Sequence, residues 1–132
     1  MERQFINPEG LLRPGAYTPA IRVSGGTTVY VSGQVSQDAQ GNVVGKDDLL
    51  AQTEQVYKNL GIALAGAGAT FADVVKLNVY VVGYQPQHRA LLQSVREKHV
   101  VKDKPPASTL IGVQALARPE FLVEIEAVAV VG

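Results

Sequence analysis

The residues best suited to proton transfer are two glutamates near the C-terminus, Glu124 and Glu126. They lie two positions apart in a predicted β-strand, so both side chains leave the same face of it, about 7 Å from each other. Two carboxylates at this spacing raise each other's pKa, which suits general acid–base chemistry. The alternative is a solvated face, because Val123, Ile125 and Ala127 supply a buried face on the other side. The spacing alone leaves both interpretations open.

Two adjacent hydroxyl groups, Ser108 and Thr109, follow a pair of prolines at the start of another predicted strand, where they can position or attack a ligand. A nucleophilic serine needs a neighbouring base. The only histidines, His88 and His99, lie on the apolar stripe of a predicted helix, where packing or surface roles are more common than catalysis. A Ser-His-acid triad is therefore not expected.

No metal or other cofactor is predicted. Two widely spaced histidines without clustered carboxylates match no metal-ligand pattern, and the chain contains no cysteine. Tyr17 lies in a loop between glycine and proline residues, an unusual position for a core aromatic. It is predicted either to cover a ligand or to cover the edge of a sheet.

The composition is that of one ordinary globular domain spanning residues 1–132, with 46% hydrophobic residues. Twelve Lys and Arg balance twelve Asp and Glu, so the net charge is zero and nucleic acid is an unlikely partner. The N-terminus lacks the apolar segment of a signal peptide, and no apolar run is long enough to cross a membrane. We therefore expect a cytoplasmic protein without membrane contact.

The apolar patterns predict the element order β-β-β-α-β-α-β-β, an α+β fold with two helices on one face of a sheet. Gly25 and Gly26 are expected to form a hairpin turn between the second and third strands. The predicted strands are 3–6, 20–23, 27–32, 74–82, 107–113 and 122–131, and the helices are 49–66 and a second starting at Pro86.

Two helices cover only one face of such a sheet. Apolar side chains are nevertheless expected on the other face, from Val74, Val82, Leu110, Val128 and Val130. Since that face needs a cover, the pattern predicts a homo-oligomer.

Several segments in this order and spacing resemble the Rid family, the reactive intermediate deaminases also called the YjgF family. They are 15–20, 30–34 with its Ser-Gly-Gln turn, 73–80, 106–109, and 123–129 with its Glu-Ile-Glu-Ala strand. The resemblance implies a chorismate-mutase-like fold, a homotrimer and a small-molecule cleft at each subunit interface. Deaminating members hydrolyse imines and enamines of 2-amino acids to 2-keto acids and ammonia. The family's ligand contacts correspond to Tyr17, Ser32, Gly33, Ser108 and Glu124, and the matching glutamate is thought to orient the attacking water.

Ser108 departs from the deaminating pattern, which has an arginine after Pro-Ala. That arginine grips the substrate carboxylate through two hydrogen bonds, and its loss is worth about 2 to 5 kcal/mol of binding. Arg22 and Arg118 are the candidate replacements. The resemblance thus leaves two main functions: an imine or enamine hydrolase using Glu124, with hydrogen bonds from Ser108 and Thr109, or a non-catalytic ligand-binding or regulatory trimer. Ribonuclease or translation-inhibiting activity is less favoured, because no basic stripe is present.

Overall fold

The computed structural model describes all 132 residues, and its elements follow the predicted order. The strands are β1 (Glu2–Ile6), β2 (Ala20–Ser24), β3 (Thr27–Gln34), β4 (Val74–Val82), β5 (Ala107–Val113) and β6 (Val123–Val131). The helices are α1 (Leu49–Gly66), the short 3-10 helix η1 (Phe71–Asp73) and α2 (His88–Arg96). Neither α-helix is long and apolar enough to cross a membrane.

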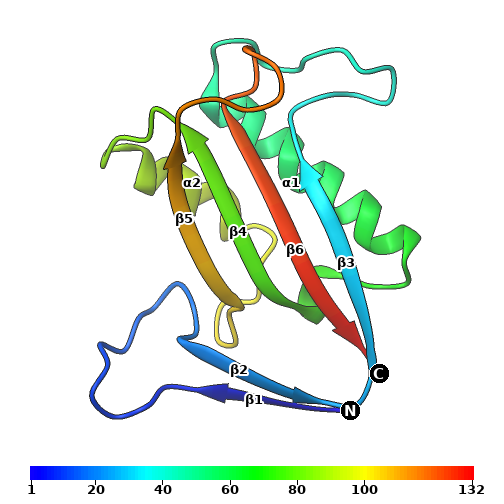
Figure 1. The fold of residues 1–132 in the computed structure, drawn as a ribbon, viewed down its shortest axis with the longest axis vertical. Helices are drawn as coiled ribbons and strands as arrows, with labels where there is room; N and C mark the ends of the chain where they lie inside the picture. Colours follow the sequence, from blue (N-terminus) through cyan, green and yellow to red (C-terminus); the bar gives the residue numbers. More distant parts are fainter.

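Four strands form the main sheet in the order β3-β6-β4-β5, with α1 and α2 on one face (Figure 1). β5 pairs parallel to β4, and the other neighbours are antiparallel, so the sheet is mixed. The α2 segment provides the crossover that a parallel pair requires. This architecture confirms the predicted α+β fold class. β5 forms one edge of the sheet, which leaves one side of that strand without a partner.

The first two strands form a separate two-stranded antiparallel sheet beside the main one (Figure 1). The predicted hairpin between the second and third strands is therefore wrong. Gly25 and Gly26 do turn the chain, with φ angles of 72° and 81°, but they carry it from one sheet to the other. A glycine pair marks a tight turn without specifying which strands pair across it.

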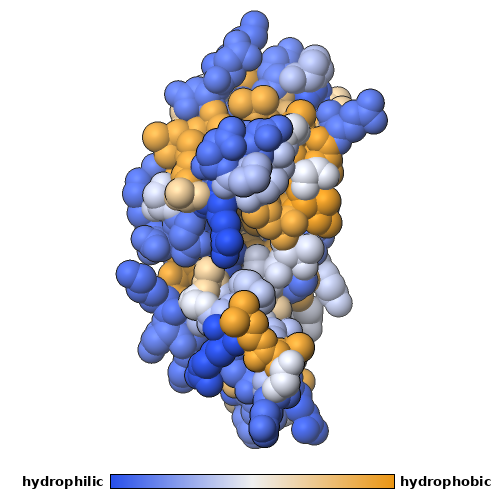
Figure 2. All heavy atoms as spheres, turned by 90° about the vertical axis from the view of Figure 1, so that its left-hand side faces the viewer, coloured by the Kyte–Doolittle hydropathy of each residue, from blue (hydrophilic) through white to orange (hydrophobic).

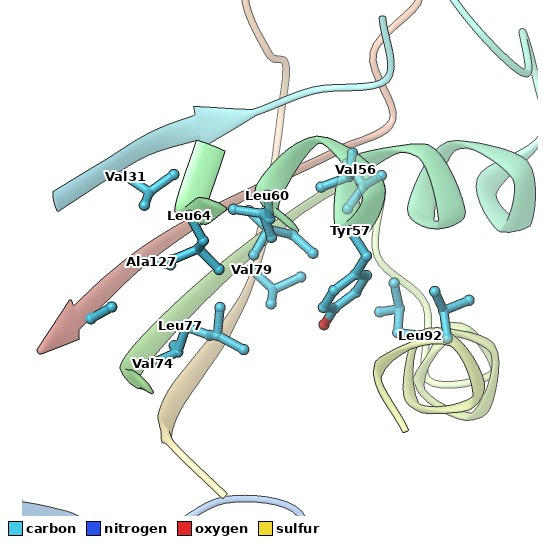
Figure 3. Packing of buried hydrophobic residues seen from close by; sticks show 14 of the residues in the cluster. Val31, Val56, Tyr57, Leu60, Leu64, Val74, Leu77, Val79, Leu92 and Ala127 are labelled. Carbon is cyan, nitrogen blue, oxygen red and sulfur yellow. The ribbon is translucent and has the colours of Figure 1, made fainter. Parts of the chain in front are cut away.

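Helix α1 supplies most of the core on the covered face. Asp48 caps it by accepting a hydrogen bond from the backbone N–H of Ala51, 3.0 Å away. Val56, Leu60 and Leu64 then recur along one stripe and pack, fully buried, toward the sheet (Figure 3). The predicted helix over 49–66 is thus confirmed, and its buried stripe sets the distance between α1 and the strands.

Helix α2 is shorter than predicted at both ends. It begins at His88, and Pro86 lies in the preceding turn. It ends at Arg96, so His99 is not on its stripe but in the turn that follows. His88 Nδ1 accepts a hydrogen bond from the Gln85 backbone N–H, and the His99 ring stacks on Tyr57 with 5.2 Å between centroids. Both histidines therefore have local structural contacts.

The second face of the main sheet carries no helix. Tyr30, 81% exposed, pairs there with Val128. Two of the apolar residues expected on this face are instead on the covered one. A β-bulge turns Val74 into the core, and Leu110 pairs with the core residue Val79. Ile111, which the pattern did not place there, pairs with Tyr80 and lies on the helix-free face.

Candidate functional site

A pocket of about 370 Å³ lies between α2 and the β5 side of the sheet. Its lining is mostly hydrophobic and includes two arginines of α2, Arg89 and Arg96, but no acidic residue. From the β5 side of the molecule, Figure 2 shows hydrophobic atoms gathered in the upper half and interrupted by strongly hydrophilic ones. A concave, mainly apolar pocket with a few polar groups is the usual form of a small-molecule site.

Arg96 is the most unusual group in this pocket, because it is only 9% exposed. Its Nη1 donates to the Ser108 hydroxyl oxygen at 3.0 Å, and its Nη2 donates to the Ala16 carbonyl oxygen at 2.9 Å. Burial lowers the pKa of Arg96, and Tyr57 partly opposes that shift; a guanidinium nevertheless stays protonated in proteins. None of the three ion pairs in the structure involves Arg96.

Tyr57 projects from α1 into the space between the sheet and α2 (Figure 3). Only 2% of it is exposed, and burial raises the pKa of its phenol to about 12, so the group is neutral at physiological pH. The hydroxyl takes part in no hydrogen bond within the chain and lies at the pocket. It is therefore available to a ligand.

The loop that carries Tyr17 is hydrogen-bonded to the segment before β5. Thr18 is buried, its hydroxyl donates to the Pro105 carbonyl oxygen at 2.6 Å, and its backbone N–H donates to that of Pro106 at 3.2 Å. These contacts place Tyr17 and Ser108 in the lining of the same pocket. Two of the predicted ligand-binding residues are thus brought together.

The other predicted site residues lie on the helix-free face. Glu124 alternates with the buried Ile125, and its carboxylate lies directly over Gly33, where an added Cβ would come within 2.2 Å of Oε2. Only glycine leaves room for the carboxylate in this position. Ser32 precedes Gly33 and is exposed, as is Thr109, whose hydroxyl oxygen accepts a hydrogen bond from Lys76 at 3.1 Å.

The pKa of Glu124 depends on its neighbours on this face. Burial, and then the charge of Glu126, raise the pKa of Glu124. The Tyr80 hydroxyl donates to Glu126 Oε1 at 2.6 Å, which raises the pKa of Tyr80. Glu124 itself makes no hydrogen bond or ion pair within the chain. The side chains of both glutamates project from one face of β6, as predicted, and this is the helix-free face. Val123, Ile125 and Ala127 form the buried face of the strand.

Within one chain, therefore, the predicted residues form two groups on opposite faces of the sheet. Tyr17 and Ser108 belong to the pocket, whereas Glu124 and Gly33 belong to the helix-free face. Ser108 pairs with the buried Leu77 and Thr109 with Asn78, so strand alternation separates even these adjacent hydroxyls.

Neither candidate replacement for the missing arginine lines the pocket. Arg22 lies on β2 in a small polar hollow. Arg118 pairs with Glu120 at 3.4 Å and lies over the Phe121 ring. The cations of the pocket are Arg89 and Arg96 instead, and neither belongs to a motif of the sequence.

A helical pattern in the sequence could have found these two residues. Arg89, Leu92, Gln93 and Arg96 follow the i, i+3, i+4, i+7 spacing of one helix face, and all four line the pocket. The apolar stripe predicted for this helix counted only hydrophobic residues and histidines, so it did not assign Arg89 and Arg96 to the face that lines the pocket.

A mixed sheet with two helices on one face and a pocket at its edge strand is the arrangement of the chorismate-mutase-like proteins. Residues 11–131 match the family model of endoribonuclease L-PSP. The chain belongs to this family, which includes the Rid, YjgF and RutC proteins.

Individual relatives support this assignment. The Rid family protein YyfB of Yersinia pestis, of unknown function, is 43% identical with a TM-score of 0.89, over 99% of this chain and 100% of that one. RidA from an Antarctic Psychrobacter is 31% identical with a TM-score of 0.70, over 97% and 99% of the two chains. A RutC family protein of Pyrococcus abyssi is 32% identical over 130 residues, 98% of each chain.

Proposed function

We propose that the protein is a cytoplasmic hydrolase of small reactive imines or enamines, acting without a cofactor at a cleft between the subunits of a homotrimer. The observation that carries this proposal is the unpaired Glu124 carboxylate held against Gly33. Both residues correspond to the family's ligand contacts, and they come from different strands. A half-buried carboxylate with a raised pKa is suited to accept a proton from water.

The reaction is a hydrolytic deamination. Glu124 takes a proton from a water molecule as the water oxygen bonds to the imine carbon. The nitrogen of this adduct takes that proton from Glu124, which gives the carbinolamine. Glu124 then accepts the hydroxyl proton and passes it to the nitrogen as the carbon–nitrogen bond breaks, so ammonia leaves and the oxygen becomes that of the ketone. One water is consumed and Glu124 is regenerated. An enamine must first tautomerise to the imine.

The arrangement of the site favours a shared cleft. Ser108 and Tyr17 are on one face of the sheet and Glu124 is on the other, so one copy separates a ligand pocket from the proposed base. The pocket lies beside the edge strand β5, where Leu110 and Ile111 are each at least 40% exposed. An unpaired edge with apolar side chains is a favourable docking surface. A second copy there would supply its own Glu124 to the pocket.

The test generates two imines in separate assays, 2-iminobutanoate with an amino-acid dehydratase and the 2-imino acid of phenylalanine with an amino-acid oxidase, and follows the loss of each in competition with a trapping amine. We expect wild-type protein at micromolar concentration to accelerate the loss, and Glu124→Gln to lower that rate by about 10² to 10⁴-fold. Glu54→Gln, an exposed carboxylate on α1, is the matched control with unchanged rate. A wild-type rate equal to the background with both imines would overturn the proposal.

The second candidate function is ligand binding without chemistry, in a regulatory trimer. It is favoured by Ser108, which replaces the arginine of the deaminating pattern. A ligand that binds and is recovered unchanged, together with a background rate in the imine assay, would select this alternative. Binding of single-stranded RNA at low salt, where phosphate contacts are strongest, would instead select a nucleic-acid function.

A further inference from the structure

The pocket under α2 holds a positive charge with no negative partner. Arg96 is almost fully buried, and both of its hydrogen bonds go to neutral oxygens, from Ser108 and Ala16. A guanidinium has five N–H donors, so three remain without an acceptor in the chain. A buried charge is costly unless an opposite charge meets it. An anion in the pocket would remove that cost.

The rest of the lining defines what the anion must carry. Leu92, Val79, Leu110 and Ile125 give apolar walls, and no carboxylate lines the pocket to repel a negative ligand. The Tyr57 ring adds an aromatic surface, and its neutral hydroxyl has no partner. The volume of about 370 Å³ is near the lower end for small-molecule sites.

We propose that this pocket binds a small monocarboxylate with a bulky apolar or aromatic body, and that Arg96 is its anchor. Two free N–H groups of the guanidinium face the two carboxylate oxygens, as in other Arg–carboxylate pairs. The body packs against Tyr57 and the apolar walls. Ser108 becomes a positioning residue, because its hydroxyl oxygen accepts a hydrogen bond from the Arg96 guanidinium. The deaminating pattern has the anchoring arginine itself at this position.

This inference rests on the proposed function, because it names the substrate class of the same cleft. It predicts selectivity for 2-imino acids with branched or aromatic side chains over the two- to four-carbon ones. A dianion such as phosphate is disfavoured, because the apolar walls cannot solvate its second charge.

The test uses unreactive probes, so that binding is measured apart from hydrolysis. Calorimetry compares 3-phenylpropanoate with its neutral amide 3-phenylpropanamide, with propanoate, and with inorganic phosphate. We expect 3-phenylpropanoate to bind at least about tenfold more tightly than each of the others. The Arg96→Met substitution is expected to weaken its binding about 30-fold or more, as loss of a charge-assisted contact predicts. Arg118→Met, outside the pocket, is the matched control without effect.

A second pair of variants keeps the test decisive if Arg96→Met fails to fold. Leu110 is 40% exposed at the pocket wall, so Leu110→Glu adds a negative charge without opening the core. It should weaken binding of 3-phenylpropanoate more than binding of the amide, whereas Leu110→Gln should change both by the same factor. Equal binding of carboxylate and amide overturns the inference, as does binding unchanged by both Arg96→Met and Leu110→Glu. Imine hydrolysis that persists in that case would leave the proposed function standing.

Discussion

The two faces of the main sheet carry opposite charges in opposite settings. On the helix-covered face, Arg96 is a buried cation bonded to neutral oxygens. On the helix-free face, Glu124 and Glu126 are half-buried carboxylates, one of them unpaired. Alternation along β6 produces this separation, because Ile125 lines the pocket while its neighbours point the other way. One chain thus holds a buried guanidinium and an unpaired carboxylate of raised pKa, but on different surfaces.

The largest expected difference between the faces is in stability. Leu64→Ala removes a fully buried side chain between α1 and the sheet, and should lower the free energy of unfolding by about 2 to 5 kcal/mol. Ile62→Ala, on the same helix but 62% exposed, should change it by less than about 0.5 kcal/mol. Urea denaturation followed by circular dichroism measures both. Equal effects of the two substitutions would contradict the assignment of the core to this face.

The helix-free face should instead control assembly. Tyr30→Lys places a charge on the most exposed aromatic of that face, and should weaken self-association by more than about tenfold if a second copy covers it. Ile62→Lys, on the outer surface of α1, is the control. Sedimentation velocity at micromolar concentration separates the outcomes. A wild-type protein that sediments as a monomer would show that this face needs no partner.

The main fold was predictable because its signals are local. β6 alternates without a break from Val123 to Ala127, and the α1 stripe repeats every three or four residues. Strand pairing was less predictable, since the Gly25-Gly26 turn joins strands of different sheets and pairing depends on distant residues. The bulge that turns Val74 inward is likewise a tertiary feature without a sequence signal.

The candidate site was predictable only in part. Residue types at the family's positions point to Glu124, Gly33 and Tyr17, but their division between two faces depends on register. Arg96 was missed because a buried arginine is uncommon and its helix face was defined by apolar residues. Only the tertiary structure brings the Arg96 guanidinium to 3.0 Å from the hydroxyl oxygen of Ser108, and no sequence pattern encodes this contact.

A smaller effect concerns the acid limb of the pH–activity profile. Activity that depends on ionised Glu124 falls as the pH falls through its pKa, which burial and Glu126 raise above the ordinary value. Glu126→Gln removes the neighbouring charge, so the limb should move to lower pH. Imine hydrolysis measured from acid to neutral pH tests this. A limb that stays in place would mean that burial alone sets the pKa.

The Tyr80 phenol gives an independent readout of the same pair. Its pKa is raised above 10, first by its hydrogen bond to Glu126 and then by burial and by the two negative charges. Glu126→Gln keeps an acceptor oxygen but removes one charge, so Tyr80 should ionise at lower pH than in the wild type. Ultraviolet titration of the wild type, Glu126→Gln and Tyr80→Phe isolates this phenol. An unchanged midpoint would contradict the charge contribution.

The smallest expected effect returns to the covered side of the sheet, at His99. Burial lowers the pKa of His99 below 6.5, against an opposing contribution from Glu54 and with a minor one from Lys98. The ring packs against both Tyr57 and Phe71, with 5.2 and 5.3 Å between the ring centroids. Since the unfolded chain then binds more protons than the folded one, the free energy of unfolding should fall as the pH drops below 6.5.

The raised pKa of Glu124 has the reverse sign: its folded form binds protons more strongly, so its contribution to stability is lost as the pH rises above 4.5. The two faces therefore respond to acid in opposite directions, and single variants separate them. The wild type should lose stability between pH 6.5 and 5, in part because His99 becomes protonated. His99→Phe should remove this contribution of His99, whereas Glu124→Gln should retain it. If instead His99→Phe and the wild type lose stability in parallel over this range, His99 is ionised as readily in the folded protein as in the unfolded chain.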